Sequence, residues 1–141
     1  SRVWLERQGM DEERIRHVCK IIEDLSFKGA GTESPMETLE GKIVQDADRL
    51  DAIGAIGIAR VFAFGGSKGR EIYNPEIEPT AHKSFDAYKA STSSSINHFY
   101  EKLFLLKDRM NTQTAKRLAG ERHAFMAAFL DRFYKEWEGN G

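Results

Sequence analysis

The sequence predicts an all-α protein, and three observations lead to that prediction. Apolar residues recur at spacings of three and four along most of the chain, which is the period of a helix with one buried face. No segment alternates apolar and polar residues with the period of two that marks a half-buried strand. The 141 residues are 40% hydrophobic and 30% charged, an ordinary balance for one globular domain. We therefore expect a single helical domain over residues 1–141.

The first two predicted helices lie within the first 25 residues. Residues 3–5 look like the last turn of a helix, and Gly9 is a suitable stop before a new start at Asp11. Because the first helix has an end but no visible beginning, we expect the natural protein to continue upstream of Ser1. Residues 11–25 follow an amphipathic pattern that opens with acidic side chains, and a glycine-containing loop is expected after them.

The remaining chain predicts three more helices and one long loop. Residues 36–64 are strongly apolar and contain many small residues, so we expect one long helix at the centre of the core. Residues 65–95 contain glycines and prolines and predict a long loop excursion, of the kind that often forms a lid or substrate loop. Helix resumes over 96–109, and Asn111 or Thr112 is suited to cap a final helix that runs to about Trp137.

Three aspartates fall within six residues of the apolar 36–64 segment, at Asp46, Asp48 and Asp51. Charge in such surroundings is costly unless it is paired or bound to a cation, and Asp is a poor residue for a helix interior. On a helix, Asp48 and Asp51 share one face and Asp46 points elsewhere. The first interpretation is a metal site, in which Asp48 or Asp51 binds the ion and the other orders its surroundings.

The second interpretation of the acidic run is structural. The aspartates would form ion pairs with Lys42, Arg49 and Arg60 on a solvated helix face. The three positions do not have the spacing of an EF-hand loop or another diagnostic ligand set. Residue chemistry alone leaves both interpretations open.

Several blocks of the chain together resemble bacterial HD-domain phosphohydrolases of the YedJ/YpgQ type. The likeness extends over essentially the whole chain and is specific as a set. The blocks are residues 17–22, 26–29, 38–60, 97–103 and 106–112.

The resemblance implies an all-α HD-domain helical bundle that binds a divalent metal and hydrolyses phosphate esters or anhydrides. The family holds its metal through a His, an adjacent His-Asp pair and a later Asp, and Asp48 matches the later Asp. Arg49 follows that position and is expected to approach the substrate phosphate as a catalytic and substrate-binding residue. Asp51 is expected to order the catalytic surroundings.

Other cationic residues are candidate substrate ligands. His17 is expected to contact a substrate phosphate or water, and the alternative is a structural histidine beside the core. Lys28 lies in a glycine-bounded loop where phosphate can be bound, as do Lys68 and Arg70 beside three glycines. The alternative for these three side chains is ordinary solvation, because neither stretch matches a P-loop.

The sequence departs from the family pattern in one respect. It contains no adjacent His-Asp pair, because its four histidines are followed by Val, Lys, Phe and Ala. The domain is therefore expected to be N-terminally incomplete, with the three earlier ligands upstream of Ser1. Residues 1–141 alone are not expected to hydrolyse a substrate.

These observations define the expected function. We expect a metal-dependent phosphohydrolase, specifically a nucleotide (pyro)phosphohydrolase, with Mn²⁺ as the first choice of cofactor and Mg²⁺, Co²⁺, Ni²⁺ or Zn²⁺ as other suitable ions. The expected partner is a nucleotide or another phosphate-containing small molecule, and a homodimer is left open. The alternative is a non-catalytic helical binding module with an ion-paired acidic face.

Composition excludes several other classes of function. The net charge of −1 gives no basic field for nucleic acid or an anionic membrane, so neither is an expected partner. No apolar run approaches the roughly 20 residues of a membrane span. Cys19 is the single cysteine, so no intramolecular disulfide can form, and a cytoplasmic location is expected.

Overall fold

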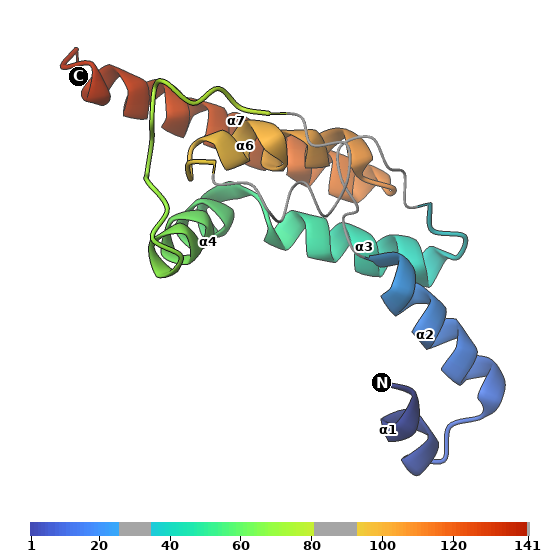
Figure 1. The fold of residues 1–141 in the computed structure, drawn as a ribbon. Helices are drawn as coiled ribbons and strands as arrows, with labels where there is room; N and C mark the ends of the chain where they lie inside the picture. The colour runs from blue at the N-terminus through green and yellow to red at the C-terminus, as the bar shows by residue number, and fades with distance from the viewer. Residues whose placement is uncertain (26–34, 81–92, 141) are drawn as a thin grey trace.

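The computed structural model describes residues 1–25, 35–80 and 93–140 and is helical throughout its regular elements (Figure 1). No strand occurs within these ranges, which confirms the all-α prediction. The elements are α1 (Arg2–Arg7), α2 (Glu12–Leu25), α3 (Leu39–Asp51), α4 (Gly54–Ser67), α6 (Asn97–Glu101), the 3-10 helix η1 (Leu103–Arg109) and α7 (Gln113–Trp137).

The core is built around α7, which packs against α3, α4 and η1. Phe99 from α6 is fully buried and stacks on Phe129 of α7, with 6.2 Å between ring centroids and 14° between planes. Aliphatic side chains complete the cluster, and burying each isoleucine, leucine or methionine among them stabilises the fold by about 1.5–3 kcal/mol. The buried members are Ile53, Ile58, Ile96, Phe99, Leu103, Leu106, Met110, Ala115, Ala119, Met126 and Leu130.

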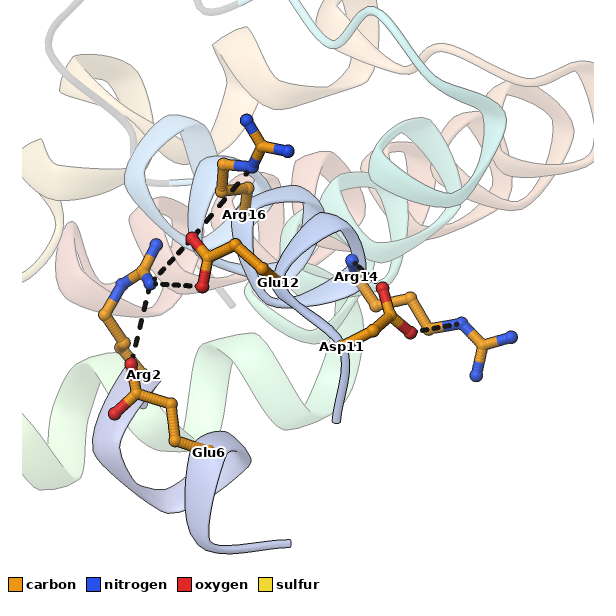
Figure 2. Close-up of polar contacts among 6 residues, drawn as sticks. All are labelled: Arg2, Glu6, Asp11, Glu12, Arg14 and Arg16. Atoms are coloured by element: carbon orange, nitrogen blue, oxygen red, sulfur yellow. Dashed lines mark hydrogen bonds and ion pairs between the residues drawn. The ribbon is translucent and has the colours of Figure 1, made fainter. Parts of the chain in front are cut away.

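Helices α1 and α2 project from the body at one end of α3 (Figure 1). Arg2 joins them, because its guanidinium donates to both carboxylate oxygens of Glu12 at 3.0 Å and lies 3.6 Å from Glu6 (Figure 2). Asp11 caps α2 by accepting from the Arg14 backbone N–H at 3.0 Å, which holds the pKa of Asp11 below its usual range. Surface ion pairs of this kind add little stability individually, and the buried side chains of these two helices are Leu5 and Ile15.

The prediction of one central buried helix over residues 36–64 is wrong. The chain bends by 64° between α3 and α4. Gly54 adopts φ +81°, and a Cβ at Gly57 would collide with the carbonyl oxygen of Ala52. Both positions therefore need glycine to make the bend. Arg122 of α7 lies over Gly54 and donates to the carbonyl of Leu50, which ties the bend to the core.

Helix α3 also buries a different face from the one its apolar residues predict. Gln45, Asp46 and Arg49 are buried, whereas Leu39 and Ile43 remain 63% and 53% exposed. The buried face is polar because it packs against the turn between η1 and α7, where backbone groups need hydrogen-bond partners. Tertiary hydrogen bonding thus overrides the hydrophobic pattern in this helix.

The predicted long excursion begins later than residue 65, because α4 continues to Ser67. Its described part, residues 68–80 and 93–96, has no helix, and residues 81–92 lie outside the described ranges. Tyr73 anchors this segment by edge contacts with Phe133, Tyr134 and Trp137 of α7. The segment is thereby positioned against the end of the core helix.

Across the described ranges, no single helix combines the length and apolar composition of a membrane span. Helices α3 and α4 reach that threshold only when they are counted together across their 64° bend.

Candidate functional site

The three aspartates of α3 have three different environments. Asp46 is buried and accepts hydrogen bonds from the backbone N–H groups of Asn111 and Thr112 at 2.7 and 2.8 Å. The side chains of the same two residues donate at 2.9 and 2.8 Å. Burial acts to raise the pKa of Asp46, but these four donors outweigh it and hold the pKa below its usual value. Asp46 is therefore a structural residue that fixes the start of α7.

Asp51 is exposed and forms an ion pair with Arg60 across the α3–α4 bend. This pairing agrees with the structural interpretation for one aspartate of the run. Asp48 is also exposed and makes no hydrogen bond or ion pair with the described residues. Of the three carboxylates, Asp48 is thus the one that has no hydrogen-bond or ion-pair partner among the described residues.

Arg49 lies on the buried face of α3, away from the exposed carboxylates. It is 9% exposed, and its guanidinium donates to the backbone carbonyl of Arg109. Burial lowers the pKa of Arg49, and the charge of Arg109 acts in the same direction. The structure does not bring Arg49 to a solvent-facing site, so its expected contact with phosphate stays a prediction.

A pocket of about 750 Å³ opens between α4 and α6 beside the α3–α4 bend. Four of its lining side chains are cationic, and none of its described lining residues is acidic. Its volume lies within the roughly 300–1,000 Å³ range of small-molecule sites. The lining residues are Ala52, Arg60, Val61, Ala63, Phe64, Gly65, Lys68, Arg70, Ser95, His98, Lys102 and Leu103.

Electrostatics connect this pocket to Asp48. Burial lowers the pKa of Lys102, while the negative charge of Asp48 raises it and the charge of Arg60 lowers it. Burial also lowers the pKa of His98 to about 4, assisted by the positive charges of Lys102 and Arg70. His98 is therefore neutral at pH 7 inside a cationic pocket, and Lys102 lies within electrostatic reach of Asp48.

The remaining predicted substrate ligands are not all found at this pocket. His17 is half-buried on α2 and lines a separate pocket of about 370 Å³ with Glu13, Lys20 and Thr38. Lys28 lies outside the described residues. Lys68 and Arg70 do line the cationic pocket, where both lie over the ring of Phe64 at 5.7 and 5.9 Å from its centroid.

Sequence reasoning missed Arg60, His98 and Lys102 as possible ligands. The positions of His98 and Lys102, four residues apart at the end of α6, place them on one face of a helical turn. This spacing is the feature of the sequence that could have identified the two residues as neighbours. It does not tell whether they line a pocket or lie on a solvated surface, because that depends on how α6 packs against α4.

The described residues do not by themselves form a metal site. Nowhere in residues 1–25, 35–80 and 93–140 do three or more His, Cys, Asp or Glu side chains gather in a way that could hold an ion. An exposed Asp48 can supply one oxygen ligand, which is too few for a protein site of the His and Asp type. A metal at Asp48 would need ligands from outside the described residues.

Comparisons with known proteins identify clear relatives. No protein-family model matches the chain. The uncharacterized protein YpgQ of Bacillus subtilis is 44% identical over 133 residues, which cover 93% of this chain and 57% of YpgQ. A solved structure of YpgQ in complex with ADP superposes with a TM-score of 0.73 at 38% identity, covering 99% of this chain and 63% of that one.

Two further solved structures agree with this relationship. A Lactobacillus plantarum protein gives a TM-score of 0.87 at 45% identity, over 97% of this chain and 65% of that one. An HD-superfamily hydrolase from Bacillus thuringiensis gives a TM-score of 0.69 at 48% identity, over 96% of this chain and 59% of that one. The chain thus spans about three fifths of the length of these relatives. The level of identity, the extent of the match and the shared helical fold together show that the chain belongs to the HD-domain family, in its YpgQ-like branch.

Proposed function

We propose that this chain is part of a metal-dependent phosphohydrolase that cleaves a phosphate ester or anhydride of a nucleotide. The observation that carries the proposal is the position of Asp48, an exposed carboxylate without a protein partner in the described structure, beside a pocket lined by cations. The hydrolase relative from B. thuringiensis supports the reaction class, and the ADP complex of YpgQ supports a nucleotide as the ligand.

The chain's own residues would bind and orient the substrate. Cations on one wall attract phosphate oxygens and offset charge that develops on them during phosphoryl transfer. Asp51 forms an ion pair with Arg60 at the bend. We propose that Asp51 orders the site by holding Arg60 in this position. In this arrangement Asp51 acts through Arg60 as a positioning residue.

The proposed metal dependence rests on the family resemblance, and Mn²⁺ is the first ion to test. A divalent ion supplies charge stabilisation and a more acidic bound water in such enzymes. The chain itself contributes Asp48, and its sequence holds no adjacent His-Asp pair. We propose that the other ligands come from polypeptide that corresponds to the part of YpgQ that this chain does not cover.

The test is release of phosphate or pyrophosphate from a nucleotide panel by the full product of the gene, with and without Mn²⁺. Turnover is expected to require the metal and to disappear in Asp48→Ala. Asp131→Ala is the matched control, because Asp131 is an exposed helical aspartate that pairs with Lys135 far along α7. Mn²⁺-dependent turnover that survives Asp48→Ala would refute the assignment of Asp48.

The alternative function is a non-catalytic binding module with an ion-paired acidic face. The Asp51–Arg60 pair and the structural role of Asp46 favour it for two of the three aspartates. Nucleotide binding without turnover under any tested metal would support this alternative.

A further inference from the structure

An exposed strap, defined as residues 71–80, follows α4 and passes beside the end of α7 (Figure 1). None of the strap residues is buried. The polypeptide that it lies against, residues 93–96, is by contrast at most 7% exposed. A segment with few buried contacts of its own opens at a lower free energy than the core does. The strap is therefore the described segment best suited to move while the helices stay in place.

The strap is attached at its beginning by backbone hydrogen bonds. The N–H groups of Ser95 and Ile96 donate to the carbonyls of Glu71 and Ile72 at 2.9 and 3.0 Å. Tyr73 adds its edge contacts with the aromatic side chains of α7. These contacts hold the base of the strap against the buried residues that precede α6.

Two buried side chains of α6, one helical turn apart, hold the far end of the strap. Asn97 is 2% exposed, and its Nδ2 donates to the carbonyl of Ile77 at 2.7 Å. Glu101 is 5% exposed, and its Oε1 accepts from the Thr80 N–H at 3.2 Å and from the Ser93 hydroxyl at 2.7 Å. Hydrogen bonds to a carboxylate are stronger than those between neutral groups, so Glu101 is the main clasp.

The strap is also stiff within itself. The Asn74 side chain donates to Glu71 and accepts from the Glu76 N–H, each at 2.9 Å. Pro75 and Pro79 fix the backbone φ at two further positions. A stiff segment that is attached at its ends moves as a body when the attachments break.

We propose that residues 71–80 open and close as one unit beside the pocket between α4 and α6, hinged at Gly69 and clasped by Glu101. Gly69 adopts φ +66° with open space around it, which suits a hinge. Arg70 adjoins the strap and Ser95 is bonded to it, and both line the pocket. Opening therefore changes one wall of the pocket. The device needs no ligand and is independent of the proposed function.

The experiment is amide hydrogen exchange of the full 141-residue chain, measured by NMR. The amides of Thr80, Ser95 and Ile96 report on both ends of the strap, and the amides of α7 report on the core. The three strap amides should share one protection factor, below that of α7. Glu101→Leu should lower all three by about 10-fold or more, because it removes a charged acceptor, and should leave α7 unchanged.

Ser93→Ala is the second variant, because it removes one donor to the same oxygen with little change in volume. It should lower the same three protection factors by a smaller amount, and it decides between the outcomes if Glu101→Leu does not fold. The matched control is Glu121→Leu, which removes an exposed glutamate that pairs with Arg117 on α7. This control should leave the strap amides unchanged.

Three outcomes would overturn the proposal. A loss of protection confined to Thr80 would show that the strap does not open as one unit. Equal losses at the strap amides and along α7 would show that Glu101 supports the whole fold rather than the strap. Unchanged protection of Thr80, Ser95 and Ile96 in both variants would show that Glu101 is not the clasp.

Discussion

The carboxylate of Asp46 accepts hydrogen bonds from both the backbone N–H and the hydroxyl of Thr112, each at 2.8 Å and across 66 residues of sequence. Thr112 in turn accepts from the backbone N–H of Ala115 at 3.3 Å and so caps α7. One buried carboxylate of α3 therefore fixes the residue that begins the longest helix of the described structure. This linkage orients the polar face of α3 and leaves Asp48 on the exposed side.

We expect Asp46→Ala to lower the free energy of unfolding by on the order of 2–3 kcal/mol, because it leaves several buried donors without an acceptor. Since the folded-state pKa of Asp46 is lowered, its contribution is present above the unfolded pKa and is lost as pH falls through the folded pKa. Urea unfolding at pH 7 and at pH 3 measures both effects. A variant as stable as the exposed control Asp131→Ala would contradict this role.

Lys102→Met should keep or slightly raise the free energy of unfolding. Burial lowers the pKa of Lys102, so the folded state binds its proton less tightly than the unfolded state does. Removing the charge removes that cost, and the methionine retains most of the apolar stem. Thermal unfolding at pH 7 tests this prediction, and a fall in Tm of many degrees would show that the ammonium group stabilises the fold.

His98 should titrate with a pKa of about 4 in the folded chain, because burial and the charges of Lys102 and Arg70 disfavour its protonated form. Stability should then be complete above the unfolded pKa near 6.5 and decrease as pH falls from there toward 4. The pKa is measured by NMR of the imidazole protons, assigned with His98→Gln. Inorganic pyrophosphate should raise it, and an ordinary pKa near 6.5 would show that His98 is not desolvated.

Gly57→Ala and Gly66→Ala should have opposite effects on stability although both lie in α4. A methyl group at position 57 would collide with the Ala52 carbonyl, so unfolding should become easier by about 3 kcal/mol or more. Position 66 has open space and ordinary backbone geometry, so alanine should stabilise by roughly 0.5–1 kcal/mol. The denaturant concentration at the midpoint of unfolding is measured for both variants. Equal midpoints for the two variants would contradict the described bend.

The sequence was sufficient to predict the helical class, a cap for the last helix at Asn111 or Thr112, and the separation of Asp46 from Asp48 and Asp51; the structure has the cap at Thr112. Each of these follows from local rules, namely periodicity, capping chemistry and helix geometry. The bend between α3 and α4 was not predicted, because Gly54 and Gly57 also suit close helix packing. The structure shows that their role instead depends on a backbone contact with Ala52 and on Arg122 of a distant helix.

The candidate site was only partly predictable for a similar reason. Asp48 could be selected from the family pattern, and Lys68 and Arg70 from their neighbouring glycines. Lys102 and His98 are separated from Asp48 by about fifty residues of sequence, so their relation to it depends on how α6 packs. Arg49 shows the converse, because it is adjacent to Asp48 in sequence and yet points about 100° away around the helix, onto the buried face of α3.

The glycines of the α3–α4 bend have a consequence for how this protein can vary. A change in a neighbouring side chain can compensate for a lost charge or a small cavity. A clash between a Cβ at position 57 and the main-chain carbonyl of residue 52 is different, because every residue type at position 52 carries that carbonyl. The angle between α3 and α4 therefore depends on a residue without a Cβ atom at position 57. A substitution of a side chain that lines the pocket changes the chemistry of the pocket, whereas a substitution of Gly57 is expected to change the bend itself.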